Sequence, residues 1–274
     1  MSLVNQCTTV GVVLRSAVTR ATVVLALGAG LLVATATEAA GPAGAPKATF
    51  LKGDVQAGPV GGALAKVKRG QVIDAGSTVK TGEGARVELT FPDGSVVRVG
   101  PSSELRLDGA SFDGKTRQVK VDAEVVGGQA WAKVATLVGK DAQFKVKTQN
   151  AVAGVRGTVF RVNVEKDEAT VVKVYNGSVA VGGAPAFLDA GADKDCKHNP
   201  VKCGRKEIAA PFREVSAEQF EHILGQMMQV RIGKTGAKAA TPTPFSAEED
   251  SNAEPEWVRW NAARDAGKDT EKSD

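Results

Sequence analysis

Asp-Gly and Asn-Gly pairs lie between runs of alternating apolar and polar residues throughout the middle of the chain. Both residues of such a pair tolerate positive φ, so a pair set between alternating runs predicts a β-hairpin. The pairs are Asp93-Gly94, Asp113-Gly114 and Asn176-Gly177. Because one short strand pattern follows another, we expect residues 47–190 to form an all-β domain.

A weak internal repeat accompanies these turns. A turn glycine followed by alternating Val or Ala recurs about every forty residues, a spacing typical of stacked repeats. The repeat occurs at Gly53-Asp54-Val55, Gly94-Ser95-Val96, Gly128-Gln129-Ala130 and Gly177-Ser178-Val179. It favours a solenoid-like domain, but a β-sandwich needs the same turns and the same alternation. Both architectures stay open at this point.

The N-terminus has the pattern of a secretory signal peptide. Arg15 and Arg20 precede an apolar run, and the small residues Ala34-Thr35-Ala36 fit a cleavage site. We therefore predict a signal peptide over residues 1–40 and a periplasmic or secreted protein. The alternative is an uncleaved anchor in the inner membrane, although residues 21–36 are short for a span of about 20 apolar residues. We expect contact with a membrane only in that alternative.

Two cysteines lie close together in a loop predicted over residues 191–210. Export would place Cys196 and Cys203 in an oxidising compartment, where a disulfide is our main interpretation. His198 lies between them, which raises the alternative of a metal site. Structural zinc sites need four ligands, usually as closely spaced pairs, and this loop falls short of that. An unpaired, solvated loop is the third possibility. We expect no metal and no cofactor.

A helix is predicted after the cysteine loop, over residues 211–233. Ser216 and Gln219 form a capping box, and apolar residues then recur at helical spacing. The apolar positions are Phe220, Ile223, Leu224, Met227 and Val230. We expect this helix to cover an open end or edge of the β domain. Alternatively, Phe220 and Met227 dock a partner protein.

Residues 234–274 have the composition of a mostly disordered tail. The tail has a net charge of −3, and residues 47–189 have a net charge of +5, so the tail could lie loosely on the domain. It contains the motif EPEWVRW, in which Trp257 and Trp260 would share a helical face. The two tryptophans either dock a partner or anchor the tail to its own β domain, and both possibilities stay open.

Enzyme chemistry is poorly represented in the sequence. The chain has two histidines and lacks the G-x-S-x-G, H-E-x-x-H and phosphate-loop motifs. Without a nucleophile or metal motif we predict that the protein is not an enzyme. Its net charge of +4 is small and its charges are interspersed, so we expect no nucleic-acid partner.

The motif AGVRGT is the most distinctive short stretch that remains. Gly154 and Gly157 let the backbone bend, and Arg156 presents five donors in a planar fork. Thr158 and Phe160 then alternate into the next strand. In one interpretation Arg156 binds backbone carbonyls and locks the fold. In the other, it binds an anionic group on a partner.

Several segments together resemble the FecR domain family. They are LKGDVQAGP, the run AKVKRGQVIDAGSTVKTGEGARVELTFPDGSVVRVGPSSELRL with its Asp93-Gly94 turn, and TQNAVAGVRGTVFRVNVEKDEATVVKVYNGSVAV. The resemblance covers about residues 47–190 and implies a bacterial extracytoplasmic β domain without catalysis. It makes the AGVRGT motif a fold signature. The founding members of the family are membrane-spanning regulators, which sense an outer-membrane iron-siderophore transporter and control a sigma factor.

Only twenty residues precede the apolar run that begins at Ala21, so we expect no cytoplasmic anti-sigma domain. The chain more closely resembles the stand-alone exported members of the family. We therefore predict a non-enzymatic, exported module that binds another envelope protein, through sheet edges or through Trp257 and Trp260. The alternatives are a signal-anchored regulator that relays an extracytoplasmic cue, and a binder of envelope polysaccharide.

Overall fold

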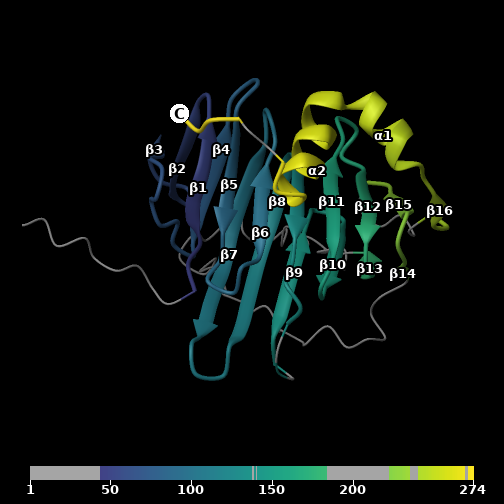
Figure 1. Ribbon diagram of the computed structural model, residues 1–274, viewed down its shortest axis with the longest axis horizontal. Coiled ribbons are helices and arrows are strands. Elements are labelled where there is room, and N and C mark those ends of the chain that lie inside the picture. Colours follow the sequence, from purple (N-terminus) through teal and green to yellow (C-terminus); the bar gives the residue numbers. More distant parts are fainter. Residues whose placement is uncertain (1–43, 138, 140, 184–221, 235–239, 269–270) are drawn as a thin grey trace, which may run out of the picture. The chain divides into compact units, whose positions relative to one another are not determined.

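The computed structural model describes residues 44–137, 139, 141–183, 222–234, 240–268 and 271–274. The predicted signal peptide, Cys196, Cys203 and Phe220 lie outside these residues. Hydrogen bonds join sixteen strands of the described chain into one network (Figure 1). This network folds into two layers, which we call layer A and layer B.

Layer A is the layer on which the C-terminal helices lie. In spatial order it consists of β1 (Lys47–Lys52), β5 (Arg86–Thr90), β6 (Val96–Val99), the end of β8 (Gln118–Lys133), β11 (Val159–Val164), β12 (Thr170–Asn176), β15 (Met228–Ile232) and β16 (Thr243–Pro244). All of these pairs are antiparallel.

Layer B lies against the side of layer A that faces away from the C-terminal helices. In spatial order it consists of β3 (Ala65–Lys66), β2 (Val55–Pro59), β4 (Ser77–Thr81), β7 (Glu104–Asp113), the first part of β8, β9 (Gln143–Lys147), β10 (Ala151–Val155), β13 (Val179–Gly183) and β14 (His222–Leu224). Only the pair β8–β9 is parallel among the described strands.

Strand β8 belongs to both layers. Its residues up to Gly127 pair with β7 in layer B, and its residues from Gly128 onward pair with β11 in layer A. Gly128 has a φ of +78°, and a Cβ there would lie 2.2 Å from Ser103 Oγ and 2.7 Å from Ser103 Cα. Only glycine combines this backbone conformation with so close an approach, so the crossing point of β8 is fixed by the sequence.

The strands of each layer follow one another in chain order, with the exception of β3. The chain therefore winds back and forth between the layers and adds strands in one direction. This winding is solenoid-like, whereas the face-to-face layers resemble a sandwich. The all-β prediction is confirmed, and both predicted architectures describe part of the observed one.

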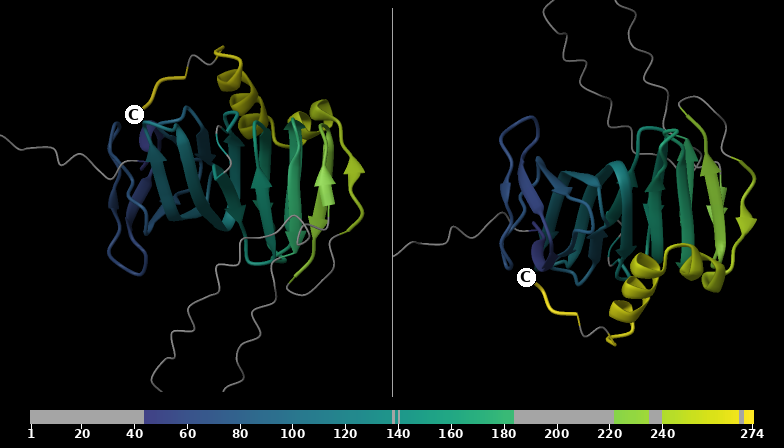
Figure 2. Two further views of the ribbon diagram at one scale, coloured as in Figure 1. Left: turned by 90° about the horizontal axis from the view of Figure 1, so that it is seen from below. Right: turned by 90° about the horizontal axis from the view of Figure 1, so that it is seen from above.

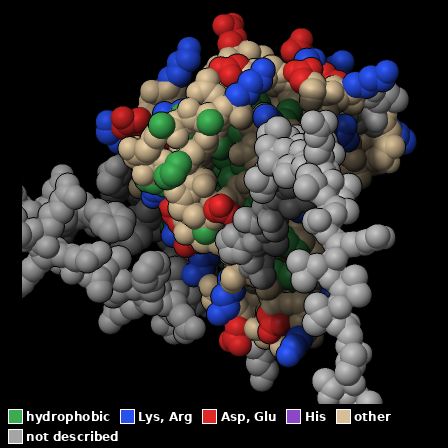
Figure 3. All heavy atoms as spheres, turned by 90° about the vertical axis from the view of Figure 1, so that its left-hand side faces the viewer, with side chains coloured by type: hydrophobic (Ala, Val, Ile, Leu, Met, Phe, Trp, Pro, Cys, Tyr) green, Lys and Arg blue, Asp and Glu red, His purple; other side chains and the backbone are tan. Residues whose placement is uncertain are grey.

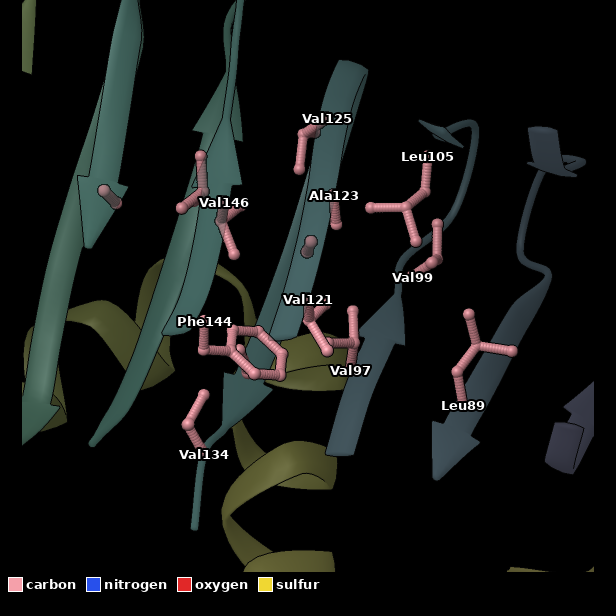
Figure 4. Close-up of a cluster of buried hydrophobic side chains, with 14 of the residues drawn as sticks. Leu89, Val97, Val99, Leu105, Val121, Ala123, Val125, Val134, Phe144 and Val146 are labelled. Atoms are coloured by element: carbon pink, nitrogen blue, oxygen red, sulfur yellow. The ribbon is translucent and has the colours of Figure 1, made fainter. Parts of the chain in front are cut away.

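The core lies between the two layers. Leu89, Val97 and Val99 of layer A lie beside residues of layer B, including Val121 and Phe144 (Figure 4). The rings of Phe91 and Phe144 meet edge to face, with centroids 5.6 Å apart. The outward-facing residues between these positions are polar or charged on most strands, as period-2 alternation requires.

Two of the three predicted hairpins form as expected. Asp93-Gly94 joins β5 to β6, and Asp113-Gly114 begins the connection between the paired strands β7 and β8. The prediction for Asn176-Gly177 is wrong. β12 pairs with β11 and β15, whereas β13 pairs with β10 and β14, so this turn carries the chain from layer A to layer B.

The helix predicted over residues 211–233 does not form in the described part of that range. Residues 222–224 and 228–232 are strands β14 and β15, which extend layers B and A. Their backbone groups satisfy the edges of β13 and β12, and Leu224, Val230 and Ile232 close the end of the core. These hydrogen bonds and this burial stabilise strands more than the helical spacing of the apolar residues would stabilise a helix. Met227 lies in the turn between these strands, with a φ of +60°.

Residues 240–268 contain helices rather than a disordered tail. They form α1 (Ala247–Ala253), the π-helical turn η3 (Pro255–Arg259) and α2 (Trp260–Asp265). Ser246 caps α1, because its side chain accepts a hydrogen bond from Glu249 N. The helices lie along one side of the strands (Figure 2). None of the described helices has the length and apolar character needed to cross a membrane.

We expect Gly128→Ala to destabilise the protein more than Gly84→Ala. Both glycines have positive φ, so each substitution costs about 1–2 kcal/mol in backbone strain. At Gly128 the new Cβ also collides with Ser103, which adds about 1–3 kcal/mol, whereas nothing lies within 4 Å at Gly84. Urea-unfolding free energies of the two variants check this. Equal losses would contradict the crossing role of Gly128.

Candidate binding surfaces

The AGVRGT motif forms a crossing from layer B to layer A. Gly154 lies in β10, and Phe160 is 1% exposed in β11, where it fills the core. Between them Gly157 has a φ of +62°, and Thr158 O accepts a hydrogen bond of 2.8 Å from Val134 N. The glycine between Arg156 and Thr158 therefore turns the backbone where it changes layer.

The next crossing, at Gly177, lies directly against this one. A Cβ at Gly177 would lie 2.7 Å from both Gly157 O and Thr158 Cγ2. Gly177 also has a φ of +83°. Two glycine-containing crossings thus touch through their backbones. This contact gives a physical reason for the two motifs GVRGT and YNGSV to occur together in one chain.

Arg156 projects from this crossing and is exposed. It forms no hydrogen bond or ion pair with any residue that the structure describes. The guanidinium is therefore not engaged with backbone carbonyls in the described chain.

Asp93 and Gly94 shape the turn between β5 and β6. Asp93 accepts hydrogen bonds from Ser95 N (3.1 Å) and Ser95 Oγ (2.7 Å), and Gly94 has a φ of +87°. Ser95 Oγ in turn accepts a bond of 3.0 Å from Ala135 N. These contacts hold the turn against the chain that follows β8, so the described role of Asp93 is structural.

A row of charged and aromatic side chains crosses the outer face of layer A. Its members are direct cross-strand neighbours on β5, β6, β8, β11 and β12. We call this row the ladder, and it consists of Glu88, Arg98, Trp131, Arg161 and Lys173. Arg98 and Arg161 are each only 3% exposed, although they point away from the core between the layers. The C-terminal segment, residues 246–268 and 271–274, covers them.

Asp265 of this segment binds the first half of the ladder. Its carboxylate accepts hydrogen bonds from Arg98 Nη1 (2.8 Å) and Trp131 Nε1 (2.9 Å). Arg98 Nε donates to Glu88 Oε2 at 2.7 Å, and Arg264 donates to both oxygens of Glu88, at 2.9 and 3.0 Å. Charges of both signs from the segment thus meet opposite charges on the sheet.

Burial alone would raise the pKa of Glu88. Hydrogen bonds from Arg264, Arg98 and Thr49 outweigh it and lower the pKa from 4.5 to about 2. Glu88 is therefore a carboxylate at neutral pH, although it is only 7% exposed. The two arginines compensate the burial of its charge.

Asp250 binds the second half of the ladder. It is 2% exposed as a side chain and accepts from Arg161 Nη2 (2.7 Å) and Lys173 Nζ (2.5 Å). Tyr175 donates to the other oxygen of the same carboxylate. Burial, together with the hydrogen bond to Asp250, raises the pKa of Tyr175, so its hydroxyl stays protonated. Glu254 Oε1 forms an ion pair with Arg161 Nη2, at 3.0 Å.

All three tryptophans of the chain lie in a second apolar cluster between the segment and layer A. Trp257 and Trp260 are 4% and 8% exposed and stack with ring centroids 5.6 Å apart. The ring centroids of Trp260 and Phe50 are 5.3 Å apart, and Arg86 Cζ lies 4.6 Å from the centroid of the Trp260 ring. The structure therefore places the tryptophan motif on its own β domain, as one of the two sequence interpretations held.

The end of the segment lies along β1. Leu51 N donates to Ser273 Oγ at 2.9 Å, and Asp274 N donates to Leu51 O at 2.9 Å. Glu271 binds Arg86 at 2.7 Å and also pairs with Lys52. These bonds occupy the side of β1 that faces away from β5, so the segment also covers part of a sheet edge.

Sequence reasoning missed the ladder and its carboxylate partners. The signal was present as charged residues at outward positions in RVELT, VVRV, FRVNV and VVKVY. Alternation alone assigns such residues to solvent. Only the opposite charges of the tail indicated that something could cover them.

No group of three metal-ligating side chains occurs among the described residues. Cys196 and Cys203 lie outside them, so their pairing stays a prediction. On the face drawn in Figure 3, acidic and basic side chains are interspersed rather than gathered by sign. That face therefore offers no basic stripe for a nucleic acid.

A family model described as "FecR protein" matches residues 77–180. This segment is a FecR domain. It contains the AGVRGT crossing and every member of the ladder, and it is shorter than the range of the sequence resemblance. The C-terminal segment that covers the ladder lies outside the FecR match.

No curated protein matches the chain. Two crystal structures of a protein from Parabacteroides distasonis, described as "a putative anti-sigma factor", are similar at 20% sequence identity with a TM-score of 0.40. In each, the similarity covers 64% of this chain and 62% of the other.

The low pKa of Glu88 predicts a specific loss of stability in acid. As the pH falls from about 4.5 to about 2, Glu88 becomes protonated in the unfolded chain before the folded one. Above this window Glu88 makes its full contribution to the free energy of unfolding. Across the window that contribution should be lost, by up to about 1.4 kcal/mol per pH unit. Glu88→Gln should remove that contribution.

Urea unfolding at several pH values measures the slope. Glu83→Gln is the matched control, because Glu83 is exposed and bonds to no described side chain. It should keep the wild-type slope. Identical slopes for the wild type and Glu88→Gln would contradict the assignment.

Proposed function

We propose that this FecR-domain protein is a non-enzymatic module of the bacterial cell envelope that acts by binding another protein. The observation that carries the proposal is the exposed Arg156 within the FecR signature, which has no partner among the described residues. The rest of the motif has structural roles. Arg156 is therefore the member of the signature that is left to bind something else.

The chemistry of Arg156 suits an anionic group on a partner protein. Its planar guanidinium binds a carboxylate through two parallel hydrogen bonds. The two touching crossings hold its backbone, so only the side chain has to be ordered on binding. Such a contact would give specificity for one carboxylate in a defined position.

The described aromatic residues do not support polysaccharide binding. Stacking on sugar rings requires exposed aromatic faces, whereas the three tryptophans are 2%, 4% and 8% exposed. A signal-anchored regulator is the second candidate. The FecR match supports it, because the founding members of the family are regulators. It differs from the first candidate in the fate of residues 1–40.

We expect Arg156→Ala to abolish partner binding and to leave the melting temperature unchanged, because the side chain contacts nothing described. Photo-crosslinking in the native host, from a reactive residue at the exposed position 178 next to Gly177, would detect the partner as a specific adduct. Arg69→Ala is the matched control, since Arg69 is also exposed but lies outside the FecR match. A lowered melting temperature with an unchanged adduct would contradict the binding role.

The N-terminus of the native protein separates the two candidates. We expect N-terminal sequencing to find a start between residues 37 and 40, with the protein in the periplasmic or secreted fraction. Removal of the apolar run leaves the rest of the chain free of the membrane. An intact N-terminus in the inner-membrane fraction would contradict the exported module and support the anchored regulator.

A further inference from the structure

The outer face of layer A is built around charges that its own domain does not neutralise. Within the ladder, Arg98, Arg161 and Lys173 face a single carboxylate, Glu88. The missing negative charge comes from Asp250 and Asp265 of the C-terminal segment. Buried charges need such partners, so this face requires an acidic occupant.

The FecR match includes the ladder and ends before the segment that covers it. The segment also differs from the sheet in kind. It consists of short helices, it carries a net negative charge, and it contributes two tryptophans to the apolar cluster. It therefore contacts layer A in the way that a separate helical peptide binds a groove.

The contact leaves several donors without acceptors. Five N–H groups at this contact are buried and unpaired, and all five belong to arginine or tryptophan side chains. They are Arg86 Nε, Arg161 Nε, Arg161 Nη1, Trp257 Nε1 and Trp260 Nε1. Each unpaired buried donor weakens the contact. A ligand with additional carboxylate or carbonyl oxygens would fit the arginines of the face better than the segment does.

We propose that this face is a receptor for a short helical segment of a partner protein, and that the C-terminal segment occupies it in the free protein. The partner helix carries carboxylates at the positions of Asp250 and Asp265, with aromatic side chains between them. The inference rests on the proposed protein-binding function. It adds the site, the chemistry of the partner and a competition between partner and segment.

The experiment uses the full chain with a protease site inserted between residues 237 and 238. The protein folds intact and is then cut, so that only non-covalent contacts retain the segment. The probe is a fluorescein-labelled peptide of residues 240–268. We expect it to bind the cut protein at least roughly tenfold more tightly than the uncut protein, in which the tethered segment competes at high effective concentration.

Two altered peptides test the chemistry of the site. A peptide with Asp250→Asn and Asp265→Asn should bind roughly tenfold or more weakly, because the buried arginines lose their partners. A peptide with Glu248→Gln and Glu249→Gln changes charge equally, but at exposed positions. It should bind as the unaltered peptide does.

Three results would overturn the proposal. Failure of the peptide to enter the cut protein would make the segment a permanent part of the fold. Unfolding after cleavage would have the same meaning. Exchange of segments between two uncut copies to give a dimer would make a second copy the occupant. Arg156 has no described contact with this face, so the photo-crosslinking experiment can succeed or fail independently of these results.

Discussion

The passage of β8 from one layer to the other is the constraint on which the rest of the structure depends. Gly128 lets a single strand pair with β7 on one side of the molecule and with β11 on the other. Because β8 joins the layers at their middle, the strands on either side must follow in chain order.

The same winding explains the glycine-rich signature. Each change of layer needs a sharp turn, and the turns at Gly157 and Gly177 touch through their backbones. The glycines of the signature therefore serve a contact between two crossings. Arg156 stands apart, because its side chain takes no described part in that contact.

Much of the fold could be predicted from the sequence, and the errors have physical causes. Turn chemistry and alternation identify strands, but they do not say which strands pair. Asn176-Gly177 therefore resembled a hairpin, although it connects two layers. The apolar spacing around Leu224 fitted a helix. These residues form strands instead, because they pair with the edges of β13 and β12. The tail resembled a disordered segment, because its partners lie far away in the sequence.

The sequence by itself determined the all-β class, the FecR signature and most turns, because these depend on neighbouring residues and on φ. Only the tertiary structure decided that Arg98 and Arg161 are buried. Their burial requires Asp265 and Asp250, which lie 167 and 89 residues further along the chain. Local periodicity contains no information on such contacts. The carboxylates and tryptophans of the C-terminal segment can bind only after the folded layers have placed the ladder residues side by side on one face.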